Sequence, residues 1–296
     1  MNTSAFVITF IGTVASIVVI LGNIFLIFST RKRRKEIVLF YFRFHIDVLF
    51  GLSYFLYSFF ILGFTIYGSS FFISNSDLFW LGLPFSNISA ARTFIVLIIV
   101  MDRLLATYLP IKYHVARPRI SNLLFYIPPF IFLIVEDFVI FIICGKNLKH
   151  IPDSCTTFPC TLNTCAYNWW TTYKSVIFPV IIFFTIILCI KLMLFSKTLQ
   201  NSGVTKRANR LALLDAFLIF FFDFVPSFVA HEFPNSPLIA YTTTGPVTAM
   251  LKQVGRAIES IIVIEILVRR QSKIEDSRRS KRSTQPIPHI ATISKP

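Results

Sequence analysis

The stretch FIVLIIVMDRLLATYLP, residues 94–110, joins an apolar run to an acid and a base in adjacent positions. Pro110 has no amide hydrogen and disfavours helical geometry at Leu109, so a helix through this stretch should end near Tyr108. At about 1.5 Å per residue, Asp102 and Arg103 then lie roughly 8–10 Å inside that end. Two charges at this depth either reach for the aqueous interface or belong to a functional site.

The remaining sequence is also apolar enough for a bilayer. Of its 296 residues, 55% are hydrophobic and 15% are charged, and the mean hydropathy is +0.70. Soluble domains usually have about 25% charged residues. A net charge of +15 would suit nucleic-acid binding, but the basic residues lie between long apolar segments rather than in one patch. We therefore expect an all-α membrane protein that contacts the lipid bilayer and binds no nucleic acid.

Seven runs approach the roughly 20 apolar residues that a membrane-spanning helix needs. They predict a seven-helix transmembrane domain over residues 1–268 and a basic, disordered cytoplasmic tail over residues 269–296. The predicted spans are residues 5–29, 37–67, 84–108, 123–144, 173–195, 211–230 and 241–268.

The basic residues predict the orientation of these spans. Twenty Lys and Arg residues fall at one end of the spans, and three, Lys146, Lys149 and Lys174, fall at the other. Cytoplasmic segments are enriched in Lys and Arg. We therefore predict a multi-pass plasma-membrane protein with its amino terminus outside and its tail in the cytoplasm.

Charges inside the spans need partners, because each costs about 2.5–3.5 kcal/mol at the centre of the bilayer. Counting residues from the span ends gives the depth of each charge. The depths predict an ion pair between Asp47 and Arg256, and a second between Arg92 and either Glu136 or Asp137.

Three of the intramembrane charges have an alternative interpretation. Asp223 falls at a depth between Arg256 and Lys252. Arg92, Asp223 and Lys252 are either members of internal ion pairs or the lining of an outward-facing ligand cavity. In a cavity, Arg92 and Lys252 would suit an anionic ligand. Lys252 alone does not indicate retinal, because no supporting motif surrounds it, and we expect no cofactor.

Four cysteines fall in or beside one outer segment, where oxidation is permitted. Cys144, Cys155, Cys160 and Cys165 are disulfide candidates, and all three connectivities remain open. Asn2 begins a glycosylation pattern close to the first span. The histidines are scattered, and neither a phosphate-binding loop nor a nucleophile motif occurs, so we expect no metal site and no enzyme.

The segment from Asp102 to Tyr113 resembles the acid-Arg-aromatic signature at the inner end of the third helix in rhodopsin-like G-protein-coupled receptors. Four further residues match intramembrane positions of that family: Asn23, Asp47, Pro179 and Pro226. Two features depart from it. The third span has no cysteine near its outer end, and GRAIES, residues 255–260, stands where the family has Asn-Pro-x-x-Tyr.

These departures, together with YFRFHID at residues 41–47, resemble the nematode serpentine chemoreceptors of class BC. The resemblance implies a rhodopsin-like seven-helix bundle that binds a small-molecule odorant or pheromone and activates a heterotrimeric G protein. It places such a receptor in the cilium of a sensory neuron and leaves homo- or heterodimers open. The alternative is a seven-helix transporter of a small solute, which can be anionic; intramembrane charges are also expected of a transporter.

The resemblance also assigns roles to individual residues. Asp102 and Arg103 would form the G-protein coupling switch, with the arginine held by its neighbouring acid at rest. Pro226 would let the sixth helix bend. The residues that would form the helix bend and the core of the bundle are Asn23, Asp47, Pro179, Pro226, Arg256 and Glu259.

Overall fold

The computed structural model describes residues 3–31, 37–67, 75–145, 157–195, 203–233 and 246–269. Asn2, Cys155 and the predicted tail beyond Arg269 lie outside these residues. The described part of the chain is helical and contains no strand.

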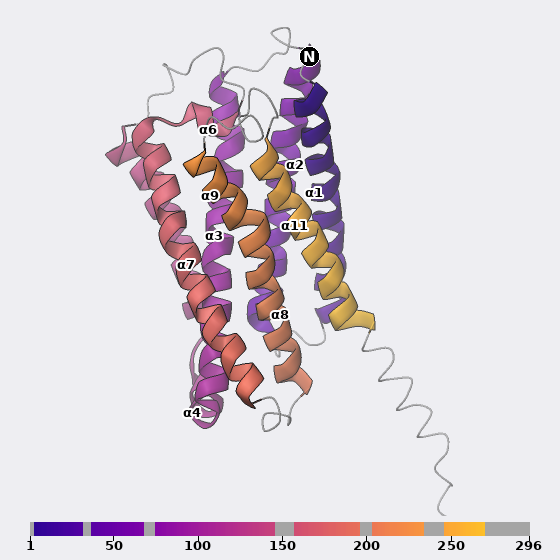
Figure 1. Ribbon diagram of the computed structural model, residues 1–296, viewed down its shortest axis with the longest axis vertical. Helices are drawn as coiled ribbons and strands as arrows, with labels where there is room; N and C mark the ends of the chain where they lie inside the picture. Colours follow the sequence, from indigo (N-terminus) through magenta and orange to yellow (C-terminus); the bar gives the residue numbers. More distant parts are fainter. Residues whose placement is uncertain are drawn as a thin grey trace, which may run out of the picture.

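Seven long helical segments make up most of the structure (Figure 1). Several continue from an α-helix into a π-helical turn. In chain order the segments are α1 (Thr3–Thr30), α2 (Val38–Tyr67), α3 (Asn75–Tyr108), α5 (Leu123–Phe138) with η4 (Val139–Ile143), α7 (Thr164–Phe195), α8 (Gly203–Ile219) with η6 (Phe220–Phe224) and α9 (Val225–Glu232), and α11 (Val247–Ile264) with η7 (Glu265–Arg269). Among the described residues, three short helices lie at the ends of the bundle: α4 (Pro110–Ala116), η3 (Arg117–Arg119) and α6 (Phe158–Thr161).

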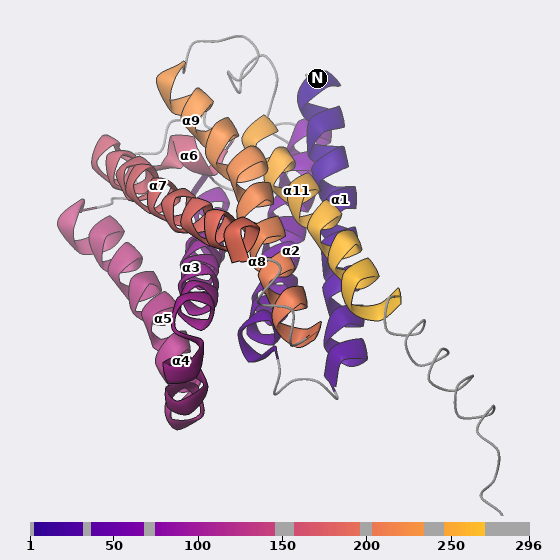
Figure 2. The same ribbon diagram turned by 60° about the horizontal axis from the view of Figure 1, so that its bottom comes forward.

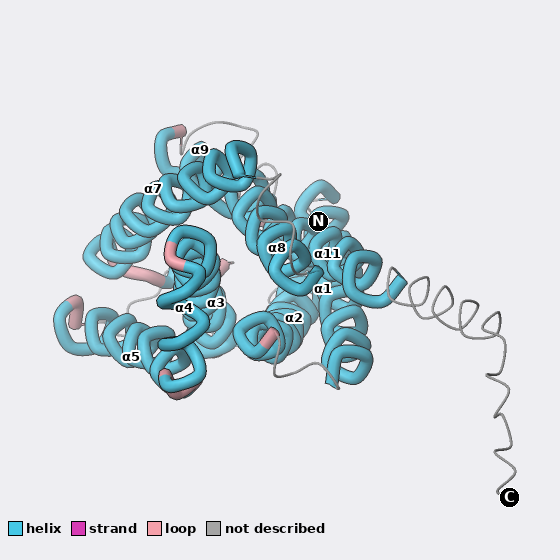
Figure 3. The backbone as a smooth tube through the Cα atoms, turned by 90° about the horizontal axis from the view of Figure 1, so that it is seen from below, coloured by secondary structure: helices cyan, strands magenta, loops and turns pink. Residues whose placement is uncertain are grey.

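The long helices run side by side and form one bundle (Figures 1 and 3). Helix α3 contacts α2, α5, α7 and α8, while α1 packs against α2 and α11. Figure 2 shows α4 beyond the lower end of α3, opposite the end that carries α6 and the amino terminus. We call these two ends the α4 end and the α6 end.

Five of the helical segments are long and apolar enough to cross a membrane. They cover residues 3–30, 38–67, 123–143, 164–194 and 209–230. Helix α11 is less apolar because Lys252, Arg256 and Glu259 lie within it, and all three are buried.

The side chains are distributed as expected for a protein surrounded by lipid. Large apolar side chains are exposed on the outside of the bundle, including Phe28, Leu21, Met193 and Leu194. Conversely, charged side chains lie inside it, and Arg43 and Arg92 are among the largest fully buried residues. A bilayer favours this arrangement because it solvates the apolar exterior and penalises an exposed charge.

Helices α3, α7 and α8 begin earlier than the apolar runs predict, and α8 starts at Gly203 rather than Leu211. Helix α3 starts at Asn75 rather than Pro84, because Asp77 favours its first turn and the buried Phe79 and Leu83 pack in the core at the α6 end. Helix α7 starts at Thr164 rather than Tyr173. The side chain of Asn163 accepts a hydrogen bond of 2.9 Å from the Ala166 amide, which caps the helix.

The early start of α7 corrects the position predicted for one basic residue. Lys174, counted from the sequence among the basic residues at the outer end of the spans, lies eleven positions along α7 and is buried.

Candidate functional site

Two arginines and three carboxylates meet in the centre of the bundle. Arg43 of α2 places Nη1 2.7 Å from Asp215 Oδ2 of α8 and 2.6 Å from Glu259 Oε1 of α11. Arg92 of α3 places Nη2 2.6 Å from Glu259 Oε2 and 3.3 Å from Asp215 Oδ1, and its Nε donates to Asp47 of α2. This ionic core therefore connects four helices.

A second group of charges continues from the ionic core toward the α6 end. Asp223 Oδ1 of η6 lies 2.8 Å from Lys252 Nζ, and Asp223 Oδ2 accepts a hydrogen bond of 3.3 Å from Arg256 Nη2. Arg256 Nη1 lies 3.5 Å from Glu259 Oε2, which links the two groups. Four cations and four carboxylates take part, so the whole network is neutral: Arg43, Arg92, Lys252 and Arg256 face Asp47, Asp215, Asp223 and Glu259. Neutrality is what makes so many buried charges tolerable in a low-dielectric interior.

The predicted pair of Asp47 with Arg256 is wrong. Asp47 pairs instead with Arg92 and with Arg43, whose Nε lies 3.4 Å away one helical turn earlier on α2. The depth of Asp47 in the bundle does not determine which of several cations at a similar depth is its partner. A partner on the same helix and another on the adjacent α3 are nearer than one on α11.

The predicted pair of Arg92 with Glu136 or Asp137 is also wrong. Asp137 accepts a hydrogen bond of 2.8 Å from Asn87, five residues before Arg92 on α3. Five residues correspond to about 7.5 Å along a helix. The depth predicted for Asp137 relative to α3 is therefore in error by about this distance. Both carboxylate oxygens of Glu136 are buried without a hydrogen-bond partner among the described residues.

The remaining predicted core residues differ in their surroundings. Asn23 is buried in α1 and donates to the Val19 carbonyl at 2.9 Å. Pro179 does not lie in the core, because its side chain is exposed on the outer face of α7. Pro226 is the second residue after the π-helical turn η6. The wider turn accommodates the missing amide hydrogen of the proline, and such turns are frequent at functional sites.

At the α4 end, Asp102 is the centre of a separate polar cluster. Its side chain is buried and accepts Arg103 Nε at 3.0 Å, the Tyr113 hydroxyl at 2.9 Å and Arg117 Nε at 3.3 Å. The Tyr113 hydroxyl also accepts a hydrogen bond of 3.1 Å from Arg103 Nη2. Asp102 therefore holds both the end of α3 and the following α4–η3 segment.

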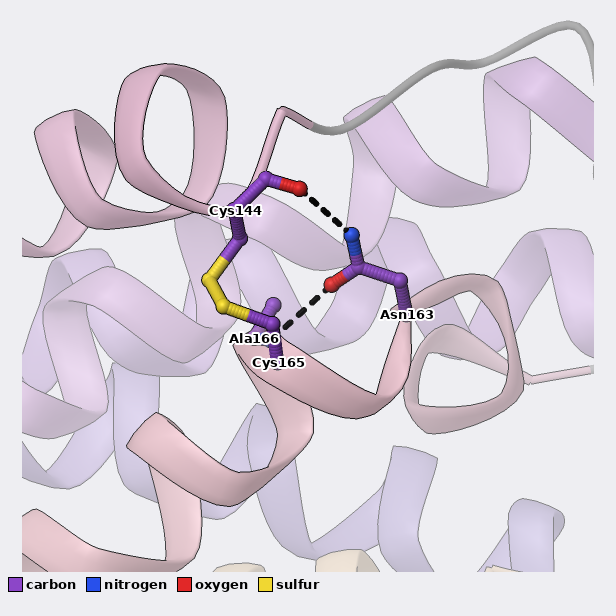
Figure 4. The surroundings of a disulfide bond; sticks show 4 residues. All are labelled: Cys144, Asn163, Cys165 and Ala166. Carbon is purple, nitrogen blue, oxygen red and sulfur yellow. Dashed lines mark hydrogen bonds between the residues drawn. A yellow bond between two sulfur atoms is a disulfide. The ribbon is translucent and has the colours of Figure 1, made fainter.

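The α6 end is closed by a disulfide between Cys144 and Cys165 (Figure 4). It joins the end of η4 to the first turn of α7, with a Cα–Cα distance of 5.5 Å. Asn163 reinforces the junction, because its Nδ2 donates to the Cys144 carbonyl at 2.8 Å. Cys160 is also disulfide-bonded.

A pocket opens between α7, α9 and the first turn of α11, in the half of the bundle nearer the α6 end. Its walls are mainly aromatic, with one ammonium group and several hydroxyls. Among the lining residues are Trp170, Lys174, Phe178, Phe224, Phe228 and Thr248. The residues predicted to line a ligand cavity are not among them. Arg92 is fully buried in the ionic core, while Lys252 and Asp223 lie just behind the pocket.

Sequence reasoning missed five residues of these sites: Arg43, Asp215, Tyr113, Arg117 and Lys174. Two of them carried a usable signal. Arg43 and Asp47 are one turn apart on an otherwise apolar run, and Asp215 and Asp223 are eight residues apart within another, which places each pair on one helix face. No group of three or more His, Cys, Asp or Glu side chains in the described part of the chain is arranged to hold a metal ion.

Comparison with known protein families gives one match. The model of the family described as "Serpentine type 7TM GPCR chemoreceptor Srbc" matches residues 1–271. This range includes all the sites described above. Among curated proteins, none matches the chain.

Proposed function

Since the chain belongs to the Srbc family of serpentine seven-transmembrane chemoreceptors, we propose that it binds a small molecule from the outside and activates a heterotrimeric G protein. A chemoreceptor family is a family of receptors, not of enzymes. The proposal includes a rhodopsin-like bundle in the plasma membrane of a sensory cilium, with the amino terminus outside.

The chemistry of the two ends supports this orientation. The disulfide at the α6 end suits an oxidising exterior. Arg103, Arg117 and Arg119 gather at the α4 end, where cytoplasmic basic residues are expected. The pocket, on the α6 side of the ionic core, then opens toward the outside and the Asp102 cluster faces the cytoplasm.

The single observation that carries the proposal is the Asp102 cluster. Arg103 is partly exposed, with 16% of its side-chain surface accessible, yet it is held by Asp102 and Tyr113. An arginine that is held but not buried can change partners when a neighbouring helix moves. Release of Arg103 from Asp102 would offer its guanidinium to a G protein.

The ionic core supplies a physical connection from the pocket to this cluster. Phe224, in the pocket wall, is adjacent in sequence to Asp223, which is bound by Lys252 and Arg256. Through Glu259 the network continues to Arg92 on α3, the helix that carries Asp102. A ligand that moves η6 would therefore change the contacts of α3.

The test is expression of the full chain in cells with a G-protein readout, against a panel of small metabolites and pheromones. Arg103→Ala should abolish the ligand-dependent signal while surface expression persists. Arg119→Ala, an exposed arginine at the same end, is the matched control and should signal normally. Unchanged signalling by Arg103→Ala would refute the role of the pair. Uptake of a labelled compound into the cells without G-protein activation would identify a transporter instead.

A further inference from the structure

The pocket between α7, α9 and α11 contains a cation that the described residues do not pair. Lys174 lies in the wall of the pocket and is 8% exposed. Its Nζ atom is buried and has no hydrogen-bond acceptor in the described part of the chain. In a membrane protein a buried ammonium group normally pairs with an anion or faces a cavity that receives one.

The ammonium group of Lys174 is held in place by Trp170, one turn earlier on α7, which is itself hydrogen-bonded to α3. Nζ lies over the ring of Trp170, 3.1 Å from the ring centroid, which is a cation–π contact. The indole Nε1 of Trp170 donates a hydrogen bond of 3.0 Å to Ser86 Oγ on α3. Trp170 is therefore fixed, and it holds Lys174 in position without neutralising its charge.

The nearest carboxylates do not neutralise Lys174 either. Asp223 acts on it electrostatically but already forms ion pairs with Lys252 and Arg256. Lys252 adds a second positive charge near the same place, with Nζ 5.9 Å from the Trp170 centroid. Glu136 on α5 also acts on Lys174, but no ion pair between the two forms in the described structure. An anion in the pocket would therefore meet an amino group that no carboxylate of the described residues already pairs.

The other walls are suited to an apolar group. Phe178 and Phe224 pack with a centroid distance of 5.5 Å, and Phe224 and Phe228 with 5.7 Å. Ser175 and Ser227 also line the pocket, and the Ser175 hydroxyl donates a hydrogen bond of 3.1 Å to the Thr171 carbonyl. A ligand that fills this pocket would place an anionic head at Lys174 and an apolar body against the phenylalanines.

From this geometry we infer that the ligand is a small carboxylate with an apolar or aromatic body, and that Lys174, rather than Arg92, binds its carboxylate. The inference rests on the proposed receptor function and specifies the chemical class of its ligand. Lys174 Nζ donates a charge-assisted hydrogen bond to the carboxylate, and no bond is made or broken covalently.

Binding of defined probes to the purified full chain in lipid nanodiscs tests the inference. The probes are octanoate and phenylacetate, and the uncharged controls are octanamide and phenylacetamide, which have matching shapes. Thermal stabilisation of the protein reports binding. Millimolar carboxylate should stabilise the wild type, and the amides should bind at least about tenfold more weakly.

Three variants locate the carboxylate. Lys174→Met keeps the length of the side chain but removes its charge, and should weaken carboxylate binding by about thirtyfold or more. Lys174→Arg should retain binding. Lys191→Met removes a lysine from the other end of α7, where Nζ lies 4.8 Å from the Tyr108 centroid, and should bind like the wild type.

Equal binding of amides and carboxylates, wild-type binding by Lys174→Met, or no stabilisation by millimolar carboxylate would each overturn the inference. If Lys174→Met does not fold, the comparison of amides with carboxylates on the wild type and on Lys174→Arg decides. Nucleotide exchange with the same compounds separates this inference from the proposed function. If carboxylates bind but do not stimulate nucleotide exchange on the G protein, the proposed receptor function is wrong and the ligand class stands. If only neutral compounds stimulate exchange, the receptor function stands and the inferred carboxylate ligand is wrong.

Discussion

Arg43 Nη1 and Asp215 Oδ2 lie 2.7 Å apart, although one residue is on the second long helix and the other on the sixth. Both side chains are almost completely buried. Since Arg43 also pairs with Asp47 and Glu259, it neutralises carboxylates from three helices at once.

Removing the charge of Arg43 should strongly destabilise the bundle. In Arg43→Met three buried carboxylates share only Arg92 and Arg256, and loss of one partner of a buried pair typically costs about 3–5 kcal/mol. Thermal unfolding of the solubilised protein measures the loss. Asp215→Asn in the same chain should restore part of it. His45→Ala, an exposed position on α2, is the control and should change the stability by about 0.5 kcal/mol or less.

Tyr113→Phe should raise ligand-independent G-protein activation. Burial raises the pKa of Tyr113, so its hydroxyl stays protonated at physiological pH and donates to Asp102. Without this hydroxyl, Arg103 loses one of its two partners, worth about 1–1.5 kcal/mol, and basal nucleotide exchange should increase up to about tenfold. Tyr108→Phe, an exposed tyrosine nearby, should leave it unchanged. An unchanged rate of basal nucleotide exchange in Tyr113→Phe would show that Tyr113 does not restrain Arg103.

Gly255→Ala should destabilise the contact of α11 with η6. A Cβ atom at this position would lie 2.7 Å from Cγ of Phe222, so one helix must move away. Such overpacking typically lowers the free energy of unfolding by about 1–3 kcal/mol. This loss exceeds the stabilisation expected from the higher helix propensity of alanine. Thermal unfolding measures the cost. Phe222→Gly in the same chain also removes the Phe222 Cβ atom, which would lie 2.5 Å from the added Cβ, and should reverse part of the cost. Independent, additive effects of the two substitutions would contradict the proposed contact.

Cys165→Ser should lower the stability of the α6 end. The disulfide to Cys144 closes a loop with a sequence separation of 21 residues, which corresponds to about 3 kcal/mol in the chain-entropy description. Thermal unfolding should show the loss in the variant, and a reductant should reproduce it in the wild type. Cys189→Ser, the free cysteine of α7, should unfold like the wild type. If Cys165→Ser and Cys189→Ser lower the stability equally, the loss comes from replacing a sulfur atom and not from breaking the disulfide.

The sequence indicates the helices better than it indicates their contacts. Apolar runs are a property of single segments, so they reveal where a chain can cross a bilayer. They do not reveal where polar flanking residues continue a helix. The first turns of α3 and α7, which Asp77 and Asn163 stabilise, were therefore missed.

Partners of the buried charges were harder to predict than the charges themselves. Depth is one coordinate, whereas pairing also depends on which helices adjoin and which faces they turn to each other. Asp47 and Arg92 were recognised as intramembrane charges, but their mutual contact requires α2 and α3 to be neighbours. The motif GRAIES shows the same point. Gly255, Arg256 and Glu259 each have a contact that only the assembled bundle supplies.

The π-helical turn at residues 220–224 divides the sixth helix into two halves with separate tasks. Asp215, below the turn, belongs to the ionic core, while Phe228, above it, belongs to the pocket wall. A π-helical turn contains one residue more than an α-helix of the same register. Deleting a single residue there would rotate the upper half by about 100° relative to the lower half. The register of this helix, and with it the set of side chains that faces the pocket, can therefore change by insertion or deletion while the ionic core below stays the same.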